Sequence, residues 1–186
     1  MSKPLRFIQI ALIALGVIML YFGINRQPTW LAGLGLLLLS GGVALFGVRD
    51  IYYLQASEWD QTTHRERTYT GIGAILGGVF TLMLAAGSAA AGLVLIFGAW
   101  DAFWDYLKAR PGVALLLLGM ALLSGGVKYL LGAKEDRSTR WDIILRSLPE
   151  RVLGAVMGLI GLASLIAGAV EVLFPAGFDR LLARLF

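Results

Sequence analysis

The sequence contains no cysteine and only one histidine, and these absences limit the chemistry it can carry. Without cysteine there is no disulfide, no thiolate metal ligand and no cysteine nucleophile. The histidine, His64, stands in a polar segment beside Thr63 and Arg65, so we assign it no role. No carboxylate pair, metal-spaced histidines or activated nucleophile falls within the apolar segments. We therefore expect a protein that is not an enzyme, with no catalytic residue, no metal site and no cofactor.

Charged residues are also scarce, at 15% of the chain, whereas hydrophobic residues make up 58%. Soluble domains average roughly 25% and 45–50%. The apolar residues form long blocks that a chain of this size cannot hide inside a soluble core. We expect lipid to surround them, and we expect the net charge of +4 to contact lipid headgroups rather than nucleic acid.

Five apolar blocks can cross the hydrocarbon as helices, because a span needs about 20 residues and its backbone must satisfy its own hydrogen bonds. They cover residues 7–24, 30–48, 68–100, 113–133 and 152–174. This pattern predicts an all-α polytopic membrane protein with one transmembrane domain over residues 1–186. The first block follows Lys3 and Arg6 as a secretory signal would. It exceeds a signal core of roughly 7–15 residues, so we expect a retained span.

The third block is too long for an upright span. About 33 residues would rise roughly 50 Å against about 30 Å of hydrocarbon. The block must tilt, protrude or break near Gly87 and Ser88, and we favour one long tilted helix. After the fifth block, residues 178–186 alternate arginines with leucines, which predicts a short amphipathic helix on the membrane surface.

The basic residues predict the orientation, because cytoplasmic loops carry an excess of lysine and arginine. With the N-terminus inside, the inner side holds Lys3, Arg6, Arg49, Arg65, Arg67, Lys134, Arg137, Arg140, Arg146 and Arg151. The outer side holds only Arg26, Lys108, Arg110, Arg180 and Arg184. We therefore expect a plasma membrane protein, in a bacterium the inner membrane, with a cytoplasmic N-terminus and an external C-terminus.

A short motif indicates an internal repeat. The segment Leu39–Val43 (LSGGV) recurs as Leu123–Val127, each time after a run of leucines and before a charged loop. We interpret this as two helical hairpins in parallel orientation, followed by one further span. The alternative is chance recurrence of leucine, glycine and serine in a glycine-rich membrane sequence. Parallel repeats occur in some transporters, but a repeat alone does not establish transport.

Small residues follow one face of the third block at spacings of three and four. They are Gly71, Ala74, Gly78, Thr81, Ala85, Ser88 and Gly92. Gly73 and Gly77 add a second short face, and the fifth block has a similar series, Gly154, Gly158, Gly161 and Gly168. Small side chains let helix backbones approach closely in lipid, so these faces predict helix packing. The alternative is a narrow pore lined by backbone and by the hydroxyls of Thr81 or Ser88.

Charge within the spans is the best indicator of function in a membrane protein, and only Lys128 and Glu171 qualify. Both lie near span ends on opposite sides, so we do not expect them to meet. We expect each to extend to the membrane surface, and a role in transport is the alternative.

Two function hypotheses follow. The first is a non-enzymatic accessory or assembly subunit that packs in the bilayer against other membrane subunits or copies of itself. The second is a small channel or transporter for ions or small solutes, built from repeated hairpins. A water-accessible polar track through the spans would favour transport, and a dry, packed centre would favour the structural role.

Overall fold

The computed structural model describes residues 3–26, 28–60, 65–133 and 141–175, most of which are helical. The helices are α1 (Lys3–Arg26), α2 (Thr29–Tyr53), α3 (Ile72–Ile96), α4 (Trp100–Ala109), α5 (Gly112–Leu131) and α6 (Trp141–Leu173). Two antiparallel strands, β1 (Gln55–Asp60) and β2 (Arg65–Thr70), form a hairpin between α2 and α3. Within these ranges, five helices are long and apolar enough to cross a membrane. The predicted number of helices able to span a membrane is confirmed, whereas the β-hairpin departs from the predicted all-α class. The amphipathic helix predicted over residues 178–186 lies outside the described residues.

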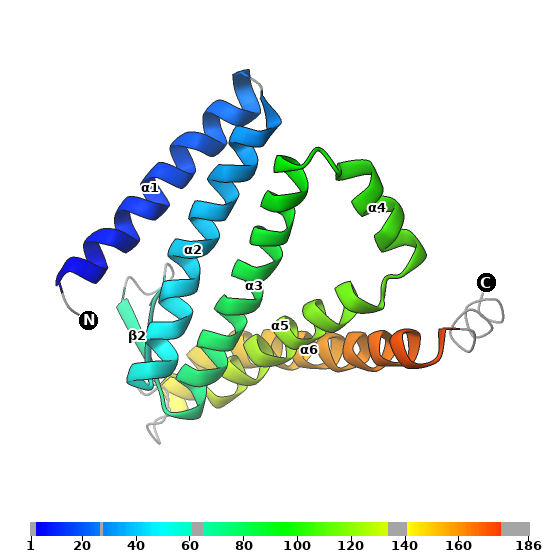
Figure 1. Ribbon diagram of the computed structural model, residues 1–186. Helices are drawn as coiled ribbons and strands as arrows, with labels where there is room; N and C mark the ends of the chain where they lie inside the picture. Colours follow the sequence, from blue (N-terminus) through cyan, green and yellow to red (C-terminus); the bar gives the residue numbers. More distant parts are fainter. Residues whose placement is uncertain (1–2, 27, 61–64, 134–140, 176–186) are drawn as a thin grey trace.

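The helices form a wedge with two arms (Figure 1). One arm is a layer in which α2 lies between α1 and α3, and the other is the antiparallel pair of α5 and α6. The arms meet where α3 contacts α5, beside the β-hairpin. We call this region, with the adjoining ends of α2, α3 and α5, the hairpin end. At the opposite side, which we call the open end, α3 and α5 separate and α4 connects them (Figure 1).

Glycines bring the helices within each arm into backbone contact. A Cβ atom at Gly78 would lie 2.6 Å from the carbonyl oxygen of Gly47, so α2 and α3 touch through their backbones. A Cβ atom at Gly161 would lie 2.5 Å from the backbone nitrogen of Leu123, and α5 and α6 are equally close there. Such approach is possible only without side chains, and it gains the dispersion contacts that associate helices in lipid.

The third apolar block does not form the single long helix that we expected over residues 68–100. The residues up to Thr70 belong to β2, and α3 ends at Ile96 without a break near Gly87. Gly71 and Gly98 explain both limits, because their φ angles of +60° and +62° lie in the left-handed region that glycine tolerates. Threonine and tyrosine at the start of the block favour a strand over a helix. The span is therefore shorter than the apolar block.

Helix α6 is longer than the fifth apolar block. It begins at Trp141, within the charged segment after the second LSGGV motif that we expected to be a loop. The sequence between Trp141 and Glu150 repeats isoleucine and leucine at spacings of three and four, which is typical of an amphipathic helix. The membrane-spanning part of α6 is Leu148–Leu173.

The predicted repeat of parallel hairpins stays a prediction. The two LSGGV motifs place their second glycines, Gly42 and Gly126, against a neighbouring helix. At Gly42 the neighbour is Ile13 of α1, which precedes α2, and at Gly126 it is Gly158 of α6, which follows α5. The motif thus serves the same packing role in both copies, but with partners on opposite sides along the chain.

Candidate functional site

The β-hairpin directs one row of side chains toward the helices. In an antiparallel pair, directly opposed residues share a face, and the faces alternate along each strand. Ala56 is opposite Tyr69, and Glu58 is opposite Arg67. Ala56 and Tyr69 are buried, Tyr69 at 2% exposure, in a cluster with Ala74 of α3. This packing fixes the hairpin and places Glu58 and Arg67 against the ends of the spans.

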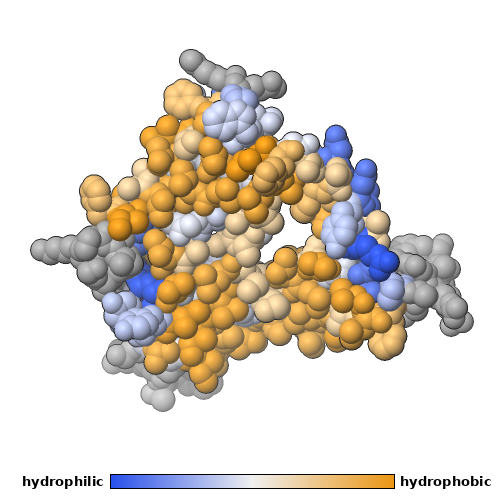
Figure 2. Space-filling model, in the orientation of Figure 1, coloured by the Kyte–Doolittle hydropathy of each residue, from blue (hydrophilic) through white to orange (hydrophobic). Residues whose placement is uncertain are grey.

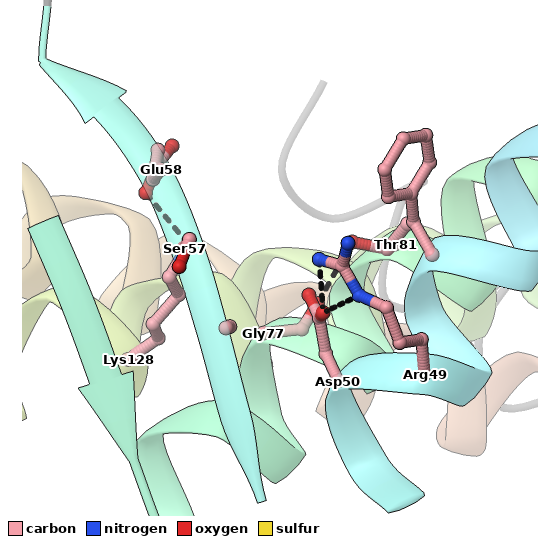
Figure 3. A pocket seen from close by; sticks show the side chains of 9 residues that line it. Arg49, Asp50, Ser57, Glu58, Gly77, Thr81 and Lys128 are labelled. Atoms are coloured by element: carbon pink, nitrogen blue, oxygen red, sulfur yellow. Dashed lines mark hydrogen bonds and ion pairs between the residues drawn. The ribbon is translucent and has the colours of Figure 1, made fainter. Parts of the chain in front are cut away.

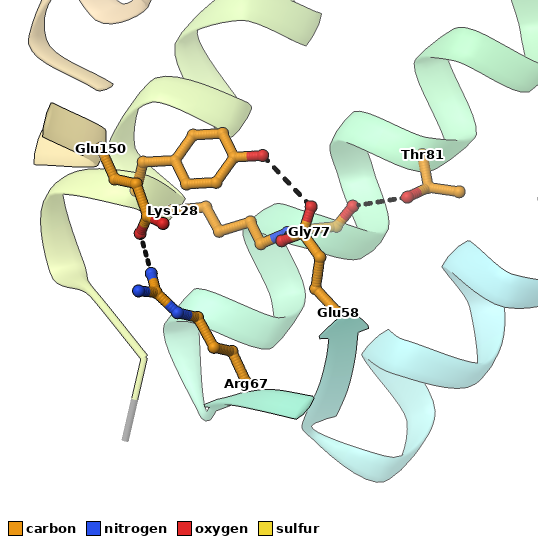
Figure 4. A network of polar contacts seen from close by, with 7 residues as sticks. Glu58, Arg67, Gly77, Thr81, Lys128 and Glu150 are labelled. Atoms are coloured by element: carbon orange, nitrogen blue, oxygen red, sulfur yellow. Dashed lines mark hydrogen bonds and ion pairs between the residues drawn. The ribbon is translucent and has the colours of Figure 1, made fainter. Parts of the chain in front are cut away.

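Glu58 pairs with the one lysine in α5 (Figure 4). Lys128 Nζ donates to Glu58 Oε2 at 2.8 Å, and the Tyr129 hydroxyl donates to Oε1 at 3.2 Å. Lys128 Nζ also lies 4.4 Å from the ring centre of Tyr69 and 5.2 Å from that of Tyr129, within cation–π range. Gly77 of α3 leaves room for the lysine, because a Cβ atom there would lie 3.3 Å from Lys128 Cδ. One lysine thus joins the two arms and the hairpin.

A second ion pair joins the hairpin to α6. Arg67 donates to Glu150, which lies near the start of the membrane-spanning part of α6 (Figure 4). Tyr69 is close to both carboxylates. Burial raises the pKa of the Tyr69 hydroxyl well above its ordinary value, and the negative charges of Glu58 and Glu150 raise that pKa further. The hairpin therefore contacts the arm of α5 and α6 through paired charges, and it contacts α3 of the other arm through the buried Tyr69.

A cavity of about 420 Å³ opens beside these contacts (Figure 3). It is lined by Phe46, Arg49, Asp50, Ala56, Ser57, Glu58, Gly77, Thr81 and Lys128. Arg49 donates to Asp50 Oδ1 through Nε at 3.0 Å and through Nη2 at 2.7 Å. In Figure 3, Gly77 lies between this ion pair and that of Lys128 with Glu58. The cavity therefore presents two cations and two carboxylates to a ligand.

Lys128 and Glu171, which we expected to extend to the membrane surface, are both buried within the structure. Lys128 is 8% exposed and Glu171 is 5% exposed. Glu171 Oε2 accepts a hydrogen bond from the backbone nitrogen of Gly112 at 3.0 Å, at the first residue of α5. A carboxylate is favourable there because the first backbone N–H groups of a helix lack partners. Because Lys128 is near the other end of α5, about 24 Å away along its axis, the two residues do not meet.

Some of the small residues predicted as packing faces contact a neighbouring helix, and others lie elsewhere in the structure. On α3, Gly78 and Gly92 contact α2, Ala85 between them is buried, and Ala74 belongs to the hairpin cluster. Thr81 lines the cavity, Ser88 is half-buried, and Gly71 precedes the helix. On α6, Gly154, Gly161 and Gly168 contact α5, and the backbone of Gly158 faces Gly126.

Sequence reasoning missed Asp50, Glu58 and Glu150, and it used Arg49 only to predict the orientation, because it treated the two segments around these residues, 49–67 and 134–150, as polar loops. A signal for the hairpin was present. The segments 55–60 and 65–70 are equal in length, and the second alternates arginine, threonine and tyrosine as strands do. Pairing them would have placed Glu58 opposite Arg67 and indicated a charged face.

No family model, curated protein or solved structure matches the chain. Its site is therefore interpreted from its own chemistry. The paired charges at the hairpin end can hold the arms together, and those facing the cavity can exchange partners with a ligand that carries both signs of charge.

Proposed function

We propose that the protein is a non-enzymatic accessory or assembly subunit that packs against a transmembrane helix of another subunit. One observation carries this proposal. Ala86, Gly87 and Ala90 of α3 are exposed, and a Cβ atom at Gly87 would meet nothing within 4 Å. At Gly78 and Gly92 of the same helix, a Cβ atom would lie 2.6 and 2.7 Å from a backbone oxygen of α2. An uncovered group of small residues is therefore suited to receive one more helix.

Hydroxyl groups within the spans favour the structural role over transport. Ser40 donates to Leu37 O, Thr81 to Gly77 O and Ser124 to Ala121 O, each within its own helix. These hydroxyls satisfy their hydrogen bonds locally. A polar track for a solute would instead require polar groups directed toward a common water-filled path.

A small channel or transporter is the second candidate. The space-filling view shows an opening between α3, α4 and α5, bordered mostly by hydrophobic residues (Figure 2). The charged cavity lies at the hairpin end of the same wedge. An assembly of several copies that enclosed the opening would connect the cavity with the other side of the membrane.

The orientation is part of the proposal. The excess of lysine and arginine supports placing the hairpin end in the cytoplasm and α4 outside, in a bacterium across the inner membrane. Cysteines introduced at Gln55 in β1 and at Ala102 in α4 should react with a membrane-impermeant thiol reagent from opposite sides only. Reaction of both from one side would contradict this orientation.

Purification in mild detergent tests the subunit role. We expect wild-type protein and the Ala163→Leu variant to bring down the same membrane partner, and Ala90→Leu to lose it. Both alanines are exposed on membrane-spanning helices, but only Ala90 lies beside the uncovered glycine. Association with further copies of this chain alone would identify a homo-oligomer. Ion or solute flux in vesicles of pure protein, abolished by Lys128→Met or Glu171→Gln, would instead support the channel.

A further inference from the structure

The cavity at the hairpin end has features of a ligand site, and it lies apart from the surface that carries the proposed subunit role. It lies where α2 ends, α3 begins and α5 ends, next to a hairpin outside the spans. This is the level at which lipid headgroups meet a membrane protein. Its volume of about 420 Å³ accommodates a small headgroup with bound water, since one water occupies about 30 Å³.

The Arg49 and Asp50 pair leaves hydrogen-bonding groups available to a ligand. Both hydrogen bonds of the pair go to Oδ1, from Nε and Nη2. In the described part of the chain, Arg49 Nη1 and Asp50 Oδ2 therefore have no hydrogen-bond partner. The side chains of Arg49 and Asp50 are 24% and 11% exposed, and both line the cavity. A guanidinium donor suits a phosphate oxygen, and a carboxylate acceptor suits an ammonium group.

The balance of charge selects a zwitterion. Two cations, Arg49 and Lys128, and two carboxylates, Asp50 and Glu58, line the cavity. A ligand with only negative charge would meet both carboxylates as well as the cations. A ligand that carries one phosphate and one ammonium group complements both signs. We infer that the cavity binds a phosphoethanolamine group.

The aromatic residues distinguish a primary from a quaternary ammonium group. Quaternary ammonium ligands are bound by aromatic faces, because they cannot donate hydrogen bonds. The rings of Tyr69 and Tyr129 are occupied by Lys128 Nζ, and the ring of Phe46 faces Arg49 at 5.1 Å. A carboxylate oxygen of Asp50, which lines the cavity, is instead an unoccupied acceptor. Ethanolamine is therefore favoured over choline.

Native mass spectrometry of the full chain tests this site. Protein in detergent receives equal amounts of phosphatidylethanolamine, phosphatidylcholine and phosphatidylglycerol. We expect the ethanolamine lipid to be retained at least about tenfold over the others, because its ammonium group can donate a charge-assisted hydrogen bond to Asp50. Equal retention of the three lipids, or preferential retention of phosphatidylglycerol, would overturn the inference and needs no variant.

Two variants localise the effect. Arg49→Gln with Asp50→Asn removes both charges without changing the net charge, and it should abolish the lipid preference. Arg110→Gln removes an arginine that is 56% exposed at the open end, and it should retain the preference. Equal preference in both variants would place binding elsewhere and overturn the site. Free phosphoethanolamine distinguishes the sources, because displacement of the lipid shows that a soluble ligand suffices, and failure to displace shows that the lipid form is required.

Discussion

At the hairpin end, α3 and α5 meet around a buried lysine that bonds to a strand glutamate and lies over two tyrosine rings. At the open end, the same two helices are joined through α4, which contributes no buried residue. The first junction combines hydrogen bonds, cation–π contacts and a packed hairpin. At the second, no hydrogen bond or ion pair joins α3 to α5 among the described residues. Separation of the helices is therefore expected to be easy at the open end and costly at the hairpin end.

The two ends also treat charge differently. Lys108 of α4 lies 3.7 Å from Asp105, and both side chains are more than 70% exposed. Such a pair contributes little, because water screens both charges and both side chains lose freedom. In the pair of Lys128 with Glu58, the lysine side chain is buried. Glu58 also accepts a hydrogen bond from Tyr129, and the Lys128 ammonium lies over the ring of Tyr69. A lysine at the hairpin end is thus structural in a way that a lysine at the open end is not.

The largest expected effect comes from placing the same bulky residue on the two kinds of α3 surface. Gly78→Leu should destabilise the protein by about 3 kcal/mol or more, since its Cβ atom would collide with Gly47 O and Ile51 Cγ1 at 2.6 and 2.5 Å. Gly87→Leu should leave stability nearly unchanged, because its surroundings are empty. Thermal unfolding of the purified protein in detergent measures both. Equal losses of stability in the two variants would show that the close contact of α2 with α3 does not cause the difference between Gly78 and Gly87.

The next effect compares the two lysines. Lys128→Met should lower the free energy of unfolding by about 1–3 kcal/mol, because it removes a charge-assisted hydrogen bond and leaves Glu58 without its cation. Lys108→Met should change it by less than about 0.5 kcal/mol. Denaturant unfolding in detergent is the measurement. Adding Glu58→Gln to Lys128→Met should recover part of the loss, and no recovery would mean that the lysine acts mainly through its tyrosine contacts.

The smallest effect appears only in alkali. Because the pKa of Tyr69 is raised, the folded protein keeps this proton above pH 10.0, where an ordinary tyrosine loses it. Stability from this group is complete below that pH and falls above it, by up to about 1.4 kcal/mol per pH unit. Tyr69→Phe should reduce the slope of stability against pH in this range. The exposed Tyr106 at the open end is the control, and an unchanged slope in Tyr69→Phe would refute the assignment.

The sequence predicted the spans well and the site poorly, for one physical reason. A span is recognised from local composition, because each helix satisfies its backbone in lipid whatever its neighbours do. The hairpin gains its stability from Tyr69 packing against Ala74 and from ion pairs between residues that are 70 or more positions apart. No local window contains both partners, so Lys128 was noticed while Glu58 was not.

The close helix contacts could be predicted in part, less well than the spans and better than the site. The spacing of glycines indicated which faces of the third and fifth blocks can pack, since absence of a side chain is a local property. Which face has a partner within the chain depends on the path of the other helices. Gly78 is covered by α2 and Gly87 is not, although both are glycines on one helix.

Composition and hydropathy alone determined that this chain is a five-span helical membrane protein with few charges to spare. Tertiary structure decided the rest. It converted a polar loop into a hairpin, turned Lys128 and Glu171 inward, and separated the two arms so that one small-residue face stayed uncovered. The physical reason is that hydrophobic partition into lipid acts on each segment by itself, whereas ion pairs, caps and backbone contacts exist only once distant segments have met.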